Sequence, residues 1–134
     1  SSVYRKLGDQ KRCNEHIKKA YEETLKIFKT WPEELSWYDM DNRKYHRAIF
    51  YRAGLYIESG DREKGLELYI QLLKMWPNDN QGVRYYAAGV YAGKSISEIN
   101  DLWDRCNDGQ NWDKIERLLS DQNKKHNFWT PPKE

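Results

Sequence analysis

Apolar residues recur along this chain at steps of three and four, which is the spacing of one helix face, and strict alternation typical of a strand is absent. After Gly60-Asp61 the apolar series runs through Gly65, Tyr69, Leu72, Leu73 and Trp76. After Gly8-Asp9 it runs through Cys13, Ile17, Ala20, Thr24, Ile27, Phe28 and Trp31. Both series end at a Trp-Pro pair, and proline cannot continue a helix. The pattern therefore predicts helices that end at residues 31–32 and 76–77.

The same phrase precedes both helices. Residues 3–9 read VYRKLGD, and residues 55–61 read LYIESGD. In the second copy the phrase closes one helix and opens the turn to the next, which predicts an antiparallel helical hairpin. One such pair cannot bury its own apolar face, so neighbouring pairs must stack to complete a core. The sequence predicts an all-α protein built from stacked hairpins.

A third unit follows the second Trp-Pro pair. The stretch QGVRYYAAGVYAG predicts a helix that begins after Asp79-Asn80 and breaks at Gly93. Either Ser95 or Ser97 caps the next helix, whose inner face holds Ile96, Ile99, Leu102, Trp103 and Cys106. A turn is expected at residues 107–109, and a last helix over 111–124 holds Trp112, Ile115, Leu118, Leu119 and Gln122 in register. The predicted domain covers residues 1–127, with units at 3–32, 46–79 and 80–107 and a Pro-containing tail at 128–134.

Residues 46–79, HRAIFYRAGLYIESGDREKGLELYIQLLKMWPND, resemble one tetratricopeptide repeat, a family unit of 34 residues. Four positions match the family's first-helix tyrosine, inter-helix turn, second-helix aromatic and closing proline: Tyr56, Gly60-Asp61, Tyr69 and Pro77. Gly65 departs from the pattern because it replaces the usual alanine, and the flanking units are degenerate. The resemblance implies a right-handed α-solenoid of antiparallel hairpins over about residues 3–124.

The first unit has almost nothing before its copy of the phrase, so most of its first helix is expected to be missing. Two explanations stay open. In one, the chain was cut from something longer and upstream residues belong to the native fold. In the other, the unit is an irregular terminal cap.

Between Pro32 and Arg43 the chain reads EELSWYDMDN, an acidic stretch that a plain repeat does not need. One interpretation is a solvated connector whose Trp37 and Tyr38 cover the end of the core. The other is a partner contact, since adjacent aromatic side chains in an acidic loop can anchor a partner. The run KLGD…ELSWY also resembles the repeat-containing tails of some large bacterial membrane proteins of glycosyltransferase type.

The composition narrows the function classes. Hydrophobic residues make up 38% and charged residues 33% of the 134 positions, which suits a fold with much surface per residue. No apolar run approaches the roughly 20 residues of a membrane span. A net charge of +2 does not favour nucleic acid. Some arginines and lysines nevertheless interleave with aromatic residues: Arg43, Lys44, Arg47, Arg52 and Arg84.

The chain shows little chemistry beyond binding. Cys13 and Cys106 lie far apart in apolar registers, which predicts two buried thiols rather than a zinc site. No motif for a nucleophile, a phosphate loop or a metallopeptidase is present. The acidic cluster Asp101, Asp104 and Asp108 is expected to face solvent. The sequence predicts no catalytic residue, no metal and no cofactor.

The positive case is a surface for a protein or peptide. The tetratricopeptide resemblance implies that first helices line a concave side, which would hold Arg47, Phe50, Gly54, Glu58, Tyr85, Gly89, Gly93 and either Lys114 or Arg117. Glycine inside a helix costs about 1 kcal/mol relative to alanine. Gly54, Gly89 and Gly93 therefore indicate either close helix approach or room for a ligand backbone. Basic and aromatic side chains favour an extended, partly acidic partner.

Two functions are compatible with these features. The first is a non-catalytic interaction module that binds a protein or peptide in the concave groove. The second is a regulatory or structural appendage of a larger protein, of the glycosyltransferase type named above, that packs on its own parent chain. An exposed apolar face at residues 3–28 would favour the second.

Overall fold

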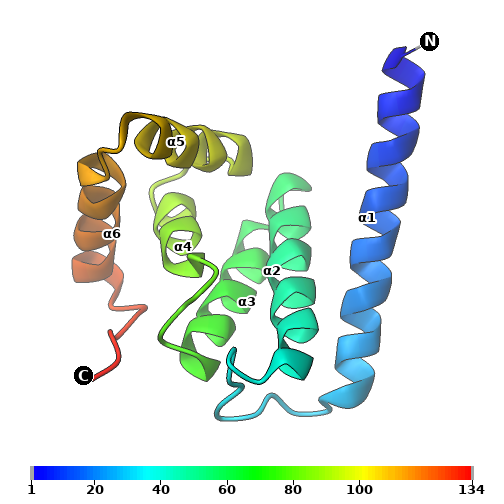
Figure 1. Cartoon of the computed structure of the whole chain (residues 1–134), viewed down its shortest axis with the longest axis horizontal. Coiled ribbons are helices and arrows are strands. Elements are labelled where there is room, and N and C mark those ends of the chain that lie inside the picture. Colours follow the sequence, from blue (N-terminus) through cyan, green and yellow to red (C-terminus); the bar gives the residue numbers. More distant parts are fainter. Residues whose placement is uncertain (1, 134) are drawn as a thin grey trace.

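The computed structural model is all-helical over the part of the chain that it describes, which is the backbone of residues 2–133 and the side chains of residues 8–133. Figure 1 shows α2, α3, α4 and α6 side by side, α1 along one edge and α5 across one end. The elements in chain order are α1 (Ser2–Ile27), a short 3₁₀ helix η1 (Met40–Asn42), α2 (Arg43–Glu58), α3 (Arg62–Met75), α4 (Val83–Tyr91), α5 (Ile96–Gly109) and α6 (Asp113–His126).

The first helix differs from the prediction. The helix expected to follow Gly8-Asp9 begins earlier, because α1 runs without interruption through both residues and the first copy of the phrase forms no turn. Nothing lies within 4 Å of the place where a Cβ of Gly8 would stand. No neighbouring segment therefore bends the chain here, and local helix formation prevails. The helix also ends at Ile27, four residues before Trp31 rather than at the Trp-Pro pair.

The second copy of the phrase forms the predicted turn. α2 ends at Glu58, Gly60 takes a left-handed φ of 97°, and the Asp61 carboxylate accepts the backbone N–H of Lys64 at 3.2 Å. Gly60 suits this conformation because it has no Cβ, and Asp61 satisfies one free N–H at the start of α3. α2 and α3 form the most closely packed helix pair, with Ile49, Ala53, Tyr69 and Leu72 in the core between them.

The end of α3 and the start of α4 also follow the prediction. α3 ends at Met75, with Trp76 as its C-cap before Pro77. The buried Asp79 then accepts the backbone N–H groups of Val83 and Arg84, both at 2.8 Å, and the Arg84 Nη1 at 2.9 Å. Asp79 therefore fixes the first turn of α4 with two hydrogen bonds and an ion pair.

The third unit differs from the expected antiparallel hairpin. Gly93 ends α4 with a φ of 80°, and Ser95, not Ser97, caps α5 in a reciprocal capping box with Glu98. Figure 1 shows α5 running crosswise to α4 and α6. The predicted turn at 107–109 is displaced, because α5 continues to Gly109 and the chain turns at Gln110 with a φ of 50°.

The folded domain extends beyond residue 127. Phe128 is buried, and the side-chain oxygen of Asn123 accepts the backbone N–H groups of Phe128 and Trp129, both at 3.0 Å. The Trp129 indole N–H donates to the Pro77 carbonyl at 2.9 Å. The predicted tail boundary at 128 is therefore placed too early, because these two aromatic residues tie the chain back onto the α3–α4 connection.

The helices pack mainly on their neighbours in the chain. α1 packs on α2, α2 on α3 and α3 on α4, while α4 also packs on both α5 and α6. Cys106 is buried in the resulting core as predicted, but Cys13 is exposed. The prediction for Cys13 is wrong because, over the described residues, α2 is the one helix that packs closely on α1, and the space between the two helices beside Cys13 is an open hollow.

Candidate functional site

One face of α2 lines a hollow on the molecular surface. Arg47, Phe50, Tyr51, Gly54 and Glu58 follow each other at steps of three, one, three and four, so they share this face. They line two adjoining depressions of about 400 and 220 Å³ that have Phe50, Tyr51 and Tyr86 in common. We call these two depressions the central hollow. The remaining lining residues come from several elements: Gln10, Asn14 and Ile17 of α1, Leu55 of α2, Ile96, Asn100 and Trp103 of α5, and Trp37, Tyr69, Asn80 and Gln81.

Aromatic rings form the floor of the central hollow. Phe50 stacks on Tyr51, with centroids 5.7 Å apart, and meets Tyr69 and Tyr86 edge to face at 5.7 and 5.1 Å. The Tyr86 hydroxyl donates to the Asn100 side chain of α5. Burial raises the pKa of both Tyr69 and Tyr86 above the ordinary tyrosine value. The floor is therefore uncharged at neutral pH and offers ring faces with a few polar ends.

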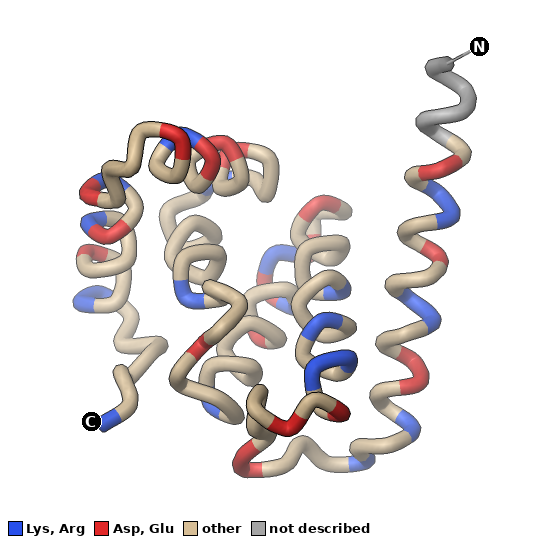
Figure 2. Tube along the Cα trace, in the orientation of Figure 1, with Lys and Arg blue, Asp and Glu red and all other residues tan. Residues whose placement is uncertain are grey.

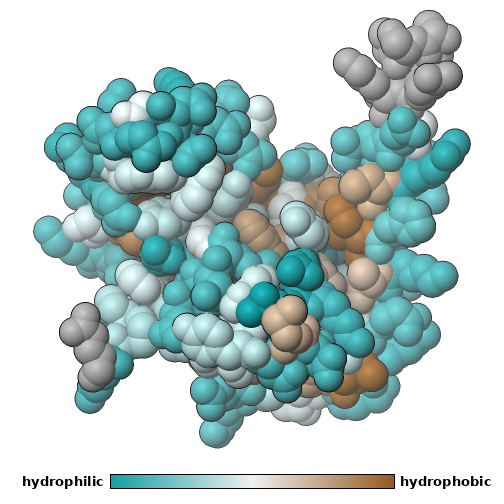
Figure 3. Space-filling view, viewed as in Figure 1, coloured by the Kyte–Doolittle hydropathy of each residue, from teal (hydrophilic) through white to brown (hydrophobic). Residues whose placement is uncertain are grey.

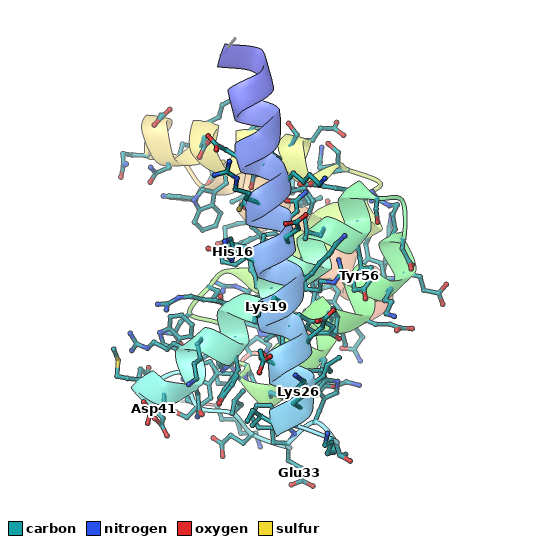
Figure 4. All side chains as sticks on the ribbon, turned by 90° about the vertical axis from the view of Figure 1, so that its right-hand side faces the viewer. His16, Lys19, Lys26, Glu33, Asp41 and Tyr56 are labelled. Atoms are coloured by element: carbon teal, nitrogen blue, oxygen red, sulfur yellow. The ribbon has the colours of Figure 1, made fainter. Side chains whose placement is uncertain are left out.

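A second hollow continues the first toward α1, and we call it the α1–α2 groove. It encloses about 580 Å³ and is lined by Asp9, Arg12, Cys13, His16, Ile17 and Ala20 of α1 and by Lys44, Arg47, Ala48 and Tyr51 of α2. Tyr51, 57% exposed, lines both hollows. Figure 3 shows hydrophobic side chains gathered between these two helices, and Figure 4 shows His16 and Tyr56 on opposite sides of α1. The two hollows together make one continuous surface, here called the concave face.

Positive charge borders this surface. Figure 2 shows Lys and Arg along α1 and on the part of α2 nearest its start. The Arg47 guanidinium lies 5.5 Å from the ring centre of Trp37, and Arg43 lies 4.8 Å from the same ring. The Arg43 Nε also donates to the Trp37 carbonyl at 2.8 Å. Trp37 is thus held in place beside the hollow by two cations, with its side chain half-buried.

The structure brings together four of the residues that the sequence singled out. Arg47, Phe50, Gly54 and Glu58 all line the central hollow. The nearest atom to a Cβ built at Gly54 is the Tyr69 hydroxyl at 3.9 Å. Gly54 therefore leaves open space above the aromatic floor, which agrees with the interpretation that its missing side chain makes room on this surface.

Tyr85 and Gly89 lie elsewhere, and their predicted place on the concave face is wrong. Tyr85 is buried, packs on Trp103 at 5.4 Å and donates to Glu116 of α6. A Cβ at Gly89 would lie 2.4 Å from Cγ1 of Ile99, so this glycine permits the close crossing of α4 and α5. One residue turns a helix by about 100°, which is why Tyr86 rather than Tyr85 reaches the hollow.

Most of the other predicted contact residues also lie apart from the concave face. Lys114 and Arg117 are exposed on α6 and line neither part of the concave face. Gly93 lies in the exposed turn after α4. Of the loop pair, Trp37 lines the central hollow, whereas Tyr38 is 66% exposed and meets Trp76 edge to face at 5.3 Å. The loop is therefore partly connector and partly wall of the site.

Several residues that line the central hollow were not predicted from the sequence as site residues. Tyr51 shares the α2 face of Arg47 and Gly54, so helical spacing alone was enough to find it. Ile96 and Trp103 were assigned only to an inner face, and Asn100 was not singled out. All three reach the hollow because α5 crosses the end of the other helices. No local pattern encodes that crossing.

No family model, no curated protein and no solved structure matches this chain. Among the described side chains, no group of three His, Cys, Asp or Glu residues is placed to hold a metal ion. Within residues 2–133, no helix combines the length and the apolar character that crossing a bilayer requires.

Proposed function

We propose that this protein is a non-catalytic interaction module that binds a protein or peptide on its concave face. The observation that supports the proposal is the continuous surface built from α1, α2, α4 and α5, with an aromatic floor and a basic border. Exposed aromatic and arginine side chains are the groups that most often dominate binding energy at interfaces. Tyr51 and Arg47 stand where the two hollows meet, so they are the expected centre of recognition.

A relation to tetratricopeptide repeats is part of this proposal, and the arrangement of the helices supports it. α2 and α3 make one antiparallel hairpin, and successive helices from α1 to α4 pack on their neighbours. We propose that these helices form part of a right-handed solenoid of the tetratricopeptide kind. The crosswise α5 departs from that pattern and closes one end of the concave face.

Selection from a displayed peptide library tests the binding function. Peptides enriched on the folded protein should bind the double variant Arg47→Glu/Tyr51→Ala about 30-fold or more weakly, since losing an interface centre costs roughly 2 kcal/mol or more. The variant Lys114→Glu, exposed on α6 outside the concave face, should bind like the wild type. Equal binding by the double variant would remove the concave face as the site. Helical content by circular dichroism checks that each variant is folded.

A second function is favoured by a different observation. Near the end of α1, Leu25 is 40% exposed and Ile27 is 60% exposed, which leaves apolar surface uncovered at the edge of the molecule. Packing on another part of a parent chain would cover these side chains. A photo-crosslinker placed at residue 27 of the full native protein should then yield an intramolecular crosslink. Crosslinks to other molecules alone would exclude this second function.

A further inference from the structure

The floor of the α1–α2 groove is apolar and open. α1 has 26 residues, and over the residues that the structure describes it packs closely on α2 alone. Cys13 and Ala20 of α1 are exposed, Ile17 is half-buried, and all three line the groove with Ala48 and Tyr51 of α2. The side chains at positions 13, 20 and 48 are small, and they leave the groove open. Its volume is about 580 Å³. Apolar surface of this kind gains free energy when a partner covers it.

The rim of the α1–α2 groove carries an excess of positive charge. Arg12 borders it from α1, Lys44 and Arg47 border it from α2, and Asp9 is the acidic residue in the lining. The ion pairs among the described side chains join Lys26 to Glu23 and Arg84 to Asp79, so the three rim cations are not neutralised by them. A partner with acidic residues beside its apolar surface therefore complements both features of the groove.

The walls of the groove favour a helical partner over an extended one. Both walls are α-helices, whose main-chain N–H and C=O groups already bond within each helix. An extended peptide would find no free backbone edge to pair with, whereas a helix satisfies its own backbone groups. The α1 lining from residue 9 to residue 20 spans about 16 Å at 1.5 Å per residue, enough for about three turns of a bound helix.

We propose that the α1–α2 groove binds one amphipathic, acidic α-helix of a partner protein. The apolar stripe of that helix, at positions i, i+3 or i+4 and i+7, lies on the groove floor. Its Asp and Glu side chains flank the stripe and meet Arg12, Lys44 and Arg47. This inference rests on the proposed binding function and deepens it, because it names the part of the concave face and the chemistry of the partner.

Cys13 provides a direct report on occupancy of the groove. The chain has two cysteines, of which Cys13 is exposed on the groove floor and Cys106 is buried. A thiol reagent added to the folded protein therefore modifies Cys13 first. The probe is a library of cysteine-free peptides of 16 residues, whose positions are randomised among apolar, acidic, basic and helix-breaking residues. Peptides that bind the folded protein are selected from it. Selected peptides that bind in the groove should slow the modification of Cys13 at least tenfold.

Matched variants on α1 locate the binding. Arg12→Glu reverses a rim charge, and Ala20→Glu places a charge on the floor. Lys18→Glu makes the same charge change as Arg12→Glu, but on the far side of α1 from the groove. Selected peptides should bind the first two variants at least tenfold more weakly and Lys18→Glu about as well as the wild type. They should be helical when bound, and their affinity should fall as salt is raised.

Each outcome has a definite meaning. Enrichment of extended, Pro-containing or basic peptides overturns the inference, and so does unchanged reactivity of Cys13 with every selected peptide. In a third outcome, Arg47→Glu/Tyr51→Ala abolishes peptide binding, whereas Arg12→Glu and Ala20→Glu leave it unchanged and the peptide does not slow the modification of Cys13. The concave face then binds through its central hollow, so the inference is wrong while the proposed function stands. If binding depends on none of these residues, the proposed function fails as well.

Discussion

Gly65 of α3 packs so closely on α2 that a Cβ at this position would lie 2.7 Å from the backbone oxygen of Ala53. The same atom would lie 2.4 Å from Cγ1 of Ile57. The Ile57 side chain can rotate, but the Ala53 carbonyl belongs to the helix backbone and cannot move without shifting α2. The absence of a side chain at residue 65 therefore sets the distance between the two helices of the central hairpin.

Gly65→Ala should destabilise the protein. Forcing a methyl group into this contact is expected to cost about 1–3 kcal/mol, more than the gain in helix propensity of about 1 kcal/mol. The free energy of unfolding, measured by urea denaturation, checks this prediction. A variant as stable as the wild type would show that α2 and α3 lie farther apart than the structure has them.

Gly54→Ala is the matched control, because it makes the same change in the partner helix. Its Cβ would lie 3.9 Å from the Tyr69 hydroxyl, which is an ordinary contact. The variant is expected to gain about 0.5–1 kcal/mol, since alanine is favoured inside a helix. If the free energy of unfolding falls in Gly65→Ala and rises in Gly54→Ala, the effect of close packing is distinguished from that of helix propensity.

Tyr69→Ala and Leu72→Ala should each cost about 2–5 kcal/mol in the free energy of unfolding, because both side chains are almost fully buried between α2, α3 and α4. Glu67→Ala, exposed on the same helix, should stay within about 0.5 kcal/mol of the wild type. Chemical denaturation of the three variants tests the assignment. A loss under about 0.5 kcal/mol at Tyr69 or Leu72 would contradict the helix register.

The stability of the protein should fall when the pH drops below about 6.5, the ordinary histidine pKa. His46 is buried, and its Nε2 donates to the Leu35 carbonyl at 2.7 Å. Burial lowers the pKa of His46 in the folded state, although the Leu35 hydrogen bond and the nearby Asp79 carboxylate partly oppose it. Below pH 6.5 the unfolded chain takes up this proton more readily than the folded one, so protonation favours unfolding.

Urea denaturation at pH 7.5 and 5.5 measures this effect. The wild type should lose more stability between these two values than His46→Gln, whose side chain does not titrate. His16→Gln, an exposed position on α1, should behave like the wild type. An identical pH dependence in wild type and His46→Gln would show that His46 does not couple protonation to folding.

The accuracy of the sequence predictions follows the range of the interactions involved. The end of α3 at Trp76-Pro77 and the capping of α5 by a serine at residue 95 or 97 were predictable because proline and a capping serine act within one turn of their own positions; the structure selects Ser95. The first copy of the repeated phrase carries the same Gly-Asp pair as the second, yet a turn forms at Gly60-Asp61 and not at Gly8-Asp9. A Gly-Asp pair permits a turn, but a packed partner helix is needed to impose it.

The sequence by itself determined the helical content, the central hairpin and the α2 face that carries Arg47, Phe50, Gly54 and Glu58, because helical spacing places these side chains on one side. Only the tertiary structure decided which helices wall the site. Whether Tyr85 or Tyr86 lines the hollow, and whether Cys13 is covered, depends on how α5 crosses α4 and on what packs beside α1. Those contacts join residues far apart in the chain, so no local pattern specifies them.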